Sequence, residues 1–446
     1  MHSSYKFCLL TLRGTSLPAT TTTYGFFLED AQRSRDTANT FLMSAEELAV
    51  VNPDTRQPPV CRSRSDFVLL LRIQSSGIAL GATYPAWVGL TSVSTSESWI
   101  DSSEPVDVEA VPMYESKLIH QFDHRFATYD GTTADQRRRG VPRSVDNSER
   151  DASLTVFTRF LIPRTIAASH LERKTPFHSA IVGYRDVARS TDERTFISSV
   201  VPFSGLMQPL NGLTADTAHN ALQIVGFSNS FVFDFAARLK TPGIHVNVTI
   251  ANQLPCAPAC NPQLASDDRF FVTRVLELTY TAWDLEAFAM DCGYDGPPFR
   301  WDEERRFLLR CELDAAYFHL YLGSPSEWGS DSPKLREMFP TPRDAVDYIM
   351  ETFPIVKRKD IKRTEVKDAQ GEVTNEGTYI TKDTILAIYD EMQQAIDSGE
   401  PYQTHVDPPP GPPTDADGNF IPMDQWNKID WSEHAHLPRE EAILKE

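Results

Sequence analysis

A turn of alternating charge, YRDVARSTDERTF at residues 184–196, contains side chains that could bind an anion. Its three arginines, Arg185, Arg189 and Arg194, carry planar guanidinium groups whose paired N–H donors match phosphate oxygens. The same turn holds carboxylates, so one interpretation is a salt-bridge hub that braces two flanking strands, which is the commoner role of such clusters. The other interpretation is a phosphate clamp, which positions a nucleic acid without reading its sequence.

A second polar stretch, FDHRFATYDG at residues 122–131, places Asp123, His124 and Arg125 between aromatic side chains. A carboxylate beside an imidazole could form a general base and its orienting partner. Adjacent residues of an extended chain point to opposite faces, however, so a catalytic pair is not favoured. We predict instead that Arg125 contacts a DNA backbone or packs between domains.

A third candidate lies around a glycine turn, where Lys240, Thr241, His245 and Asn247 could face DNA. Asparagine can bind adenine through two hydrogen bonds, and lysine can reach guanine. Apolar and polar residues alternate over 243–250, which predicts a half-buried strand. The alternative interpretation is therefore that these residues are only the solvent-facing positions of that strand.

Four stretches in combination resemble the region that follows the catalytic domain in large adenine-N6 DNA methyltransferases of the type IIG restriction–modification and phage-defence kind. The resemblance covers residues 5–395 in outline. It implies a target-recognition region that binds double-stranded DNA for a separate methyltransferase catalytic subunit. The stretches are LMSAEELAVVNPDTRQPPVCRSRSD at 42–66, MYESKLIHQFDHRFATYDG at 113–131, IVGYRDVARSTDERTFISSVVP at 181–202 and SNSFVFDFAARLKTPGIHVNVTIANQLPCAP at 228–258.

The sequence lacks the motifs that adenine methylation itself requires. Such enzymes need a glycine-rich loop for S-adenosylmethionine and an (Asn/Asp)-Pro-Pro-(Tyr/Phe) loop that grips the flipped adenine. The nearest matches, residues 52–55 and 407–410, lack the aromatic residue on which the base stacks. We therefore predict no catalytic residue and no cofactor on this chain, with S-adenosylmethionine held by the catalytic partner, and the chain inactive in methyl transfer when alone.

The net charge of −19 at pH 7 is unusual for a protein that binds DNA unaided, because such proteins usually carry a basic footprint. Residues 400–446 hold ten acidic against three basic side chains. A second hypothesis is therefore a non-enzymatic assembly or adaptor protein of a defence complex, whose acidic surface binds protein rather than DNA. A basic run at 357–367 and the arginines at 137–139 could supply DNA affinity, although such runs are more often solvated faces.

Composition gives weaker constraints on location and metal binding. Six cysteines are dispersed through 446 residues, which is typical of reduced thiols and predicts a cytoplasmic protein. Cys256 and Cys260 lie farther apart than the paired cysteines of common structural zinc sites, so no metal is predicted. No apolar run approaches the length of about 20 residues that spans a bilayer, so no membrane partner is predicted.

The pattern of apolar residues predicts a mixed α+β fold, with a target-recognition domain of short strands and helices before a helical C-terminal region and an acidic tail. Ser44 and Glu47 have the spacing of a helix capping box. Helices are predicted over 217–240, 302–322, 342–351 and 381–397, strands over 5–12, 181–184 and 196–201, and a loop over 130–153. The predicted segments are a methyltransferase-domain remnant (1–43), a connecting region (44–153), the target-recognition domain (154–295), the helical region (296–400) and the Pro-rich acidic tail (401–446).

Overall fold

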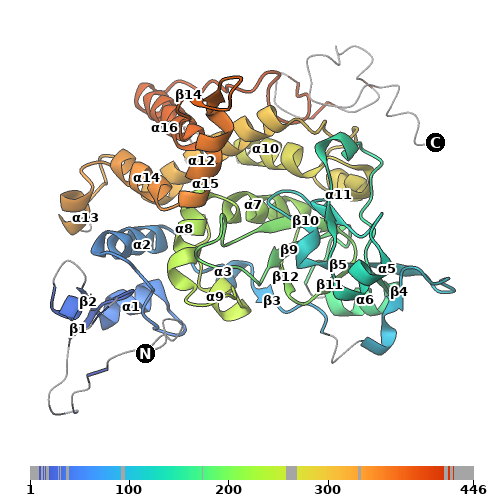
Figure 1. Cartoon of the computed structure of the whole chain (residues 1–446), viewed down its shortest axis with the longest axis horizontal. Helices are drawn as coiled ribbons and strands as arrows, with labels where there is room; N and C mark the ends of the chain where they lie inside the picture. The colour runs from blue at the N-terminus through green and yellow to red at the C-terminus, as the bar shows by residue number, and fades with distance from the viewer. Residues whose placement is uncertain are drawn as a thin grey trace.

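The computed structural model describes residues 10–425 except 12–13, 15, 17–19, 29, 31, 37–39, 92–95, 173, 258–268, 330–332, 416–419 and 422–424. It confirms the predicted α+β class, because short strands in small sheets alternate with helices along the chain (Figure 1). Among the described residues, no helix combines the length and the apolar character that crossing a membrane requires. The first predicted strand, 5–12, lies almost wholly outside the described residues.

Two four-stranded sheets form the β part of the molecule. The first has the order β10-β9-β12-β3 and is antiparallel throughout; the second has the order β11-β5-β8-β4, with β11 parallel to β5. The first contains β3 (Ala86–Trp87), β9 (Ala180–Arg185), β10 (Ser198–Pro202) and β12 (Leu210–Leu213). The second contains β4 (Ile100–Asp101), β5 (Ala110–Glu115), β8 (Phe160–Pro163) and β11 (Gly205–Met207).

Three two-stranded ribbons complete the strands. They are β1 (Thr21–Tyr24) with β2 (Phe41–Ser44), β6 (Ala127–Thr128) with β7 (Arg143–Ser144), and β13 (Val366–Lys367) with β14 (Val373–Asn375). The hairpin of β9 and β10 confirms the two strands predicted on either side of the charged turn, although β10 begins at Ser198. The three arginines of that turn therefore lie at one end of the first sheet.

Helices enclose a large apolar core beside the first sheet. The core contains buried residues from each of the five predicted segments, including Met43, Phe67, Phe233, Phe318 and Val406. The helices up to the middle of the chain are α1 (Ala45–Val51), α2 (Arg64–Ser76), α3 (Leu80–Thr83), α5 (Ala134–Arg139), α6 (Arg164–Leu171), α7 (Ala218–Ser228), α8 (Phe231–Lys240) and α9 (Val248–Asn252). The later helices are α10 (Arg269–Thr279), α11 (Glu286–Asp291), α12 (Glu303–Leu322), α13 (Pro333–Met338), α14 (Pro342–Glu351), α15 (Pro354–Thr364) and α16 (Ile380–Ser398).

Several predicted helices are confirmed, and two of them begin at the residues that the sequence indicated. The side chain of Asp302 accepts a hydrogen bond from the backbone of α12, whose first turn is acidic, as the helix dipole favours. Ser44 and Glu47 form the expected capping box of α1. The helices predicted over 342–351 and 381–397 are α14 and α16.

Three local predictions are wrong. The strand predicted over 243–250 is instead one bridge between Val187 and His245 followed by α9, because Asn247 caps that helix by accepting a hydrogen bond from Ile250. The helix predicted over 217–240 breaks into α7 and α8 because Ser230 caps the second helix. The loop predicted over 130–153 contains α5, which begins with a capping box from Thr133.

The Pro-rich segment after Pro401 is packed against the helices over its described part. The carbonyl of Pro408 accepts a hydrogen bond of 2.6 Å from Arg305 of α12, and the Gly411 backbone donates one of 2.8 Å to Glu277 of α10. The side chain of Val406 is buried in the core. The beginning of the predicted tail therefore lies along α10 and α12.

Candidate functional site

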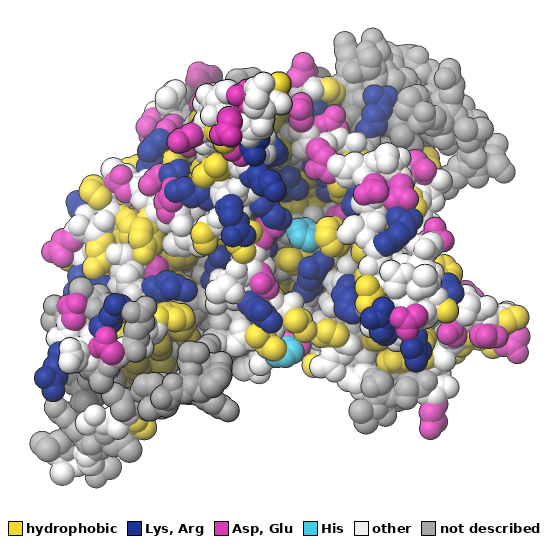
Figure 2. Space-filling view, viewed as in Figure 1, with side chains coloured by type: hydrophobic (Ala, Val, Ile, Leu, Met, Phe, Trp, Pro, Cys, Tyr) yellow, Lys and Arg dark blue, Asp and Glu magenta, His cyan; other side chains and the backbone are white. Residues whose placement is uncertain are grey.

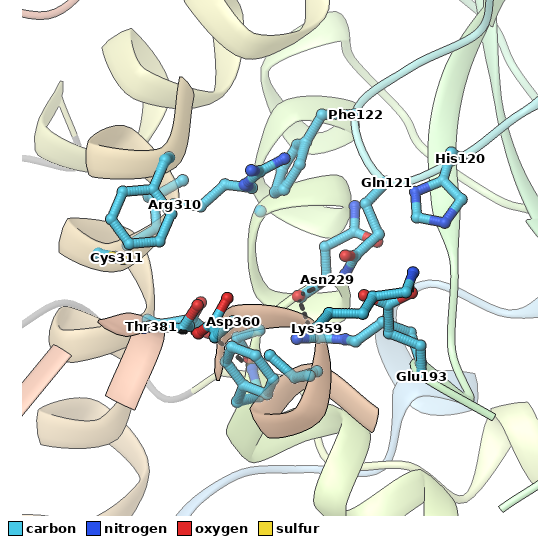
Figure 3. Close-up of a pocket in the computed structure, with 18 of the residues that line it drawn as sticks. His120, Gln121, Phe122, Glu193, Asn229, Arg310, Cys311, Lys359, Asp360 and Thr381 are labelled. Carbon is cyan, nitrogen blue, oxygen red and sulfur yellow. Dashed lines mark hydrogen bonds and ion pairs between the residues drawn. The ribbon is translucent and has the colours of Figure 1, made fainter. Parts of the chain in front are cut away.

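A pocket, which we call the larger pocket, lies where the first sheet meets α12 and α15. It has a volume of about 200 Å³ and is shown in Figure 3. Its walls come from five parts of the chain: the segment 120–122, the charged turn at Glu193 and Arg194, the α7–α8 junction, α12 with α15, and the start of α16. Three of the stretches that carry the family resemblance, 113–131, 181–202 and 228–258, thus meet at this pocket although they are separated in the sequence.

Four cationic side chains line the pocket, and their pairing differs. Lys359 pairs with Glu193, and Arg363 lies 3.7 Å from Asp360.

Arg194 is held by protein groups. Its Nε lies 3.4 Å from the Asp234 carboxylate, its terminal nitrogen donates to the Asn229 carbonyl, and its guanidinium packs on the Phe231 ring at 4.0 Å from the ring centre. Asp234 also accepts hydrogen bonds from the backbone of Thr195 and Phe196. Arg194 therefore braces the charged turn while it lines the pocket.

Arg310 differs from the other cations of the pocket. It extends from α12 into the space beside Gln121 and Phe122 (Figure 3). Within the part of the chain that the structure describes, no hydrogen bond or ion pair is assigned to its guanidinium group, and its side chain is only half-buried. Arg310 is thus the pocket cation whose donors remain available to a ligand.

Another wall of the pocket contains His120, whose imidazole is neutral, and Phe122, whose backbone conformation is constrained. Burial, followed by the positive charge of Arg185, lowers the pKa of His120 to about 3, and Arg310 and Arg194 act in the same direction. The imidazole is therefore uncharged at neutral pH, and three arginines lie within electrostatic reach of it. Phe122 has a φ of 58°, a left-handed conformation that is rare for a bulky residue and often accompanies binding sites.

Besides Glu193, which pairs with Lys359, two further carboxylates line the pocket. Asp314 accepts a hydrogen bond of 2.7 Å from the Phe231 backbone, and burial raises its pKa to about 6 although Arg194 and Arg310 oppose the shift. Asp360 accepts a hydrogen bond of 2.8 Å from the Thr381 backbone. Both acids are therefore bound to backbone donors, and the pocket keeps a cationic character.

Three of the predicted DNA-contacting residues are buried and fully engaged by the protein. Arg125 is 0% exposed, Lys240 is 6% exposed and Thr241 is 2% exposed. The ammonium group of Lys240 donates to the carbonyls of Val51 and Gln253 and to the Gln74 side chain at 2.5–2.6 Å, and the Thr241 hydroxyl donates to the Ala237 carbonyl. We therefore correct the sequence-based interpretation: these side chains hold segments together and do not reach DNA.

The other predicted residues are distributed around the charged turn and α9. Arg185 donates to the Ile119 carbonyl and is partly buried, which lowers its pKa to about 10, whereas Arg189 is exposed. The side chain of His245 is 52% exposed and lies 3.3 Å from Asp186. Asn247 uses its side-chain oxygen as the cap of α9. Of the eight predicted residues, the structure places only Arg194 in the wall of the pocket, with Arg185 near it.

The Asp–His pair is separated, as the extended-chain argument predicts. His124 lies 2.9 Å from Asp284, while Asp123 binds Arg150 at 3.0 Å. Within the described residues, no three His, Cys, Asp or Glu side chains form a group that could hold a metal ion. Cys260 lies outside the described residues.

A second, smaller pocket is lined by the first and last residues of the Asn-Pro-Asp-Thr stretch. Asn52 and Thr55 lie beside Lys240 and Gln253, around a volume of about 20 Å³. This is close to the space that one water molecule needs, so the pocket cannot hold a nucleotide base.

A basic surface adjoins the larger pocket. Positions 356, 359, 360 and 363 of α15 face the pocket, while Arg358 and Lys362 lie one helical turn apart on an adjacent, exposed face. In the region of α15, Figure 2 shows Lys and Arg side chains gathered near the middle of this face. We call Arg358, Lys362 and Arg363 with the pocket cation Arg310 the α15 basic surface.

Sequence reasoning missed Arg310, His120 and Asp314. A signal existed in the α12 sequence, because Phe307, Arg310, Cys311 and Asp314 recur at the three- and four-residue spacing of one helix face and all four line the pocket. Charged residues on an otherwise apolar helix face indicate that this face is partly enclosed by protein but does not belong to the hydrophobic core.

Comparison with known proteins adds no assignment. No family model matches the chain, and no curated protein sequence matches it.

Proposed function

We propose that this chain is the DNA-binding, target-recognition part of an adenine-specific DNA methylation or phage-defence system, and that a separate subunit supplies the catalytic core and S-adenosylmethionine. The observation that carries the proposal is the α15 basic surface on a chain whose net charge is −19. A local concentration of arginine and lysine against an acidic background is what phosphate binding requires. The resemblance of the three stretches that line the adjoining pocket supports the same family of functions.

The contacts expected from this surface are with the DNA backbone. Arg358 and Lys362 are exposed, and no ion pair is assigned to either of them within the described residues. Lysine and arginine contacts to phosphate supply affinity and orientation, while base edges supply sequence specificity. The exposed residues His245 and Arg189 are the remaining predicted candidates for contacts nearer the bases.

A second candidate function is a protein-binding adaptor of such a system. The acidic balance favours it, because residues 400–446 alone carry ten acids against three bases. An acidic surface repels DNA and attracts a basic protein partner. The two candidates differ in whether the isolated chain binds DNA.

A mobility-shift titration of the purified chain with a DNA duplex separates the two. We expect a shift without any partner, and three phosphate contacts would weaken the affinity about 40-fold between 50 and 200 mM salt. A duplex that shifts only after a second protein is added would support the adaptor instead. Methyl transfer to DNA by the chain alone would contradict the assignment of catalysis to another subunit.

A further inference from the structure

We infer that the larger pocket binds one phosphate group, with Arg310 as its principal ligand. The inference rests on the geometry of the pocket and goes beyond the proposed DNA contacts of the outer α15 surface. The phosphate could belong to a DNA strand or to a free nucleotide, and both present the same tetrahedral anion. Arginine suits that anion because its fork of N–H donors can bind two oxygens at once.

The arrangement of charges favours an anion at Arg310. Lys359 and Arg363 have carboxylate partners in Glu193 and Asp360, and Arg194 has Asp234. Arg310 extends into the pocket with no hydrogen bond or ion pair assigned to it in the described part of the chain (Figure 3). A guanidinium group in a partly enclosed space without a bonded carboxylate keeps its N–H donors available, and a phosphate would accept from them.

The size of the pocket limits what the ligand can be. A volume of about 200 Å³ is below the range of roughly 300–1,000 Å³ that holds drug-sized ligands. The space suits a phosphate and part of the group attached to it, but not a whole dinucleotide. Phe122, Phe231 and Phe307 supply apolar wall for the attached carbon atoms.

The acids of the pocket do not prevent this binding. The carboxylates of Asp314 and Asp360 accept backbone hydrogen bonds from Phe231 and Thr381, at 2.7 and 2.8 Å. An oxygen that already accepts a backbone N–H has part of its charge balanced within the protein. The phosphate would therefore be drawn to the side of the pocket on which Arg310 lies.

Isothermal titration of the whole chain with inorganic phosphate, pyrophosphate and AMP tests the inference. We expect binding by the wild type and a loss of about 10- to 100-fold in affinity for Arg310→Met, as expected when one charge-assisted contact is removed. The matched control is Arg138→Met, which removes an equal charge from an 80% exposed side chain of α5 and should leave phosphate binding unchanged. Should Arg310→Met unfold at a lower temperature, Arg310→Lys, which keeps the charge but not the fork, is expected to bind more weakly than the wild type.

A displacement experiment distinguishes the source of the phosphate. If pyrophosphate displaces a labelled duplex, the pocket holds a backbone phosphate; if AMP binds while the duplex stays bound, it holds a free nucleotide, and either result supports the site. Failure of all three ligands to bind the wild type, or an equal loss in Arg138→Met, would overturn the inference. DNA binding by the outer surface would still be measurable in the mobility-shift titration, so the two proposals can fail separately.

Discussion

Replacing Arg125 with methionine is expected to lower the free energy of unfolding by about 3–5 kcal/mol, because it removes one member of a buried charged network. The guanidinium group is 0% exposed and donates to the carbonyls of Asp151, Leu154 and Thr281 and to the Thr281 hydroxyl, at 2.6–3.3 Å. Methionine fills a similar volume but donates nothing. The substitution would thus leave buried acceptors unsatisfied and remove one nearby positive charge from the carboxylates of Asp123 and Asp284.

Chemical denaturation of the two proteins measures this difference. The matched control is Arg138→Met on α5, whose side chain is 80% exposed and pairs only with Asp135 in the same helix, so its effect should stay within about 0.5 kcal/mol. Arg125→Lys should fall between the two because a single ammonium group cannot reach all the acceptors. A loss below about 1 kcal/mol for Arg125→Met would contradict the structural role and reopen a role in DNA contact.

Reversing charge on the outer face of α15 is expected to have the largest effect on DNA binding. The double substitution Arg358→Glu with Lys362→Glu should weaken binding about 10- to 100-fold at 50 mM salt, because two phosphate contacts become repulsive. The slope of log affinity against log salt should also become less steep by about 1.8, since each lost phosphate contact contributes about 0.9. Fluorescence anisotropy with a labelled duplex gives both quantities.

The control for this prediction changes the net charge equally at a distant place. Arg138→Glu with Arg139→Glu alters two exposed arginines of α5, which lies toward the right of Figure 1, whereas α15 lies nearer the middle. If the control weakens DNA binding as much as the α15 variant, the effect comes from net charge and the α15 basic surface has no special role. A normal affinity and slope in both variants would likewise contradict the proposal.

The helices that the sequence predicted well are those with local signals. The acidic first turn of α12 and the Ser44–Glu47 capping box of α1 depend on residues within one turn of each other. The segment 243–250 shows the limit of such signals. Its alternation is that of a strand, but only His245 forms a bridge, and the cap supplied by Asn247 starts a helix instead.

The pocket could not be assembled from the sequence because its walls are joined by long-range packing. His120, Arg194, Arg310 and Asp360 come from a loop, a turn and two helices, and no local rule pairs them. The same limit explains why Arg125 and Lys240 were predicted to contact DNA although both are buried. Both appear in polar stretches typical of surfaces, yet each is enclosed by backbone carbonyls from distant segments.

The central claim is that the face around α15 binds DNA. The most direct test is to crosslink the unmodified chain to a duplex with ultraviolet light and to identify the crosslinked peptides. The account predicts crosslinks in the peptides that contain residues 354–367 and 118–126, and their loss when excess unlabelled duplex is added. Crosslinks confined to α5 or to other segments away from α15, or none at a salt concentration at which the duplex is bound, would contradict it.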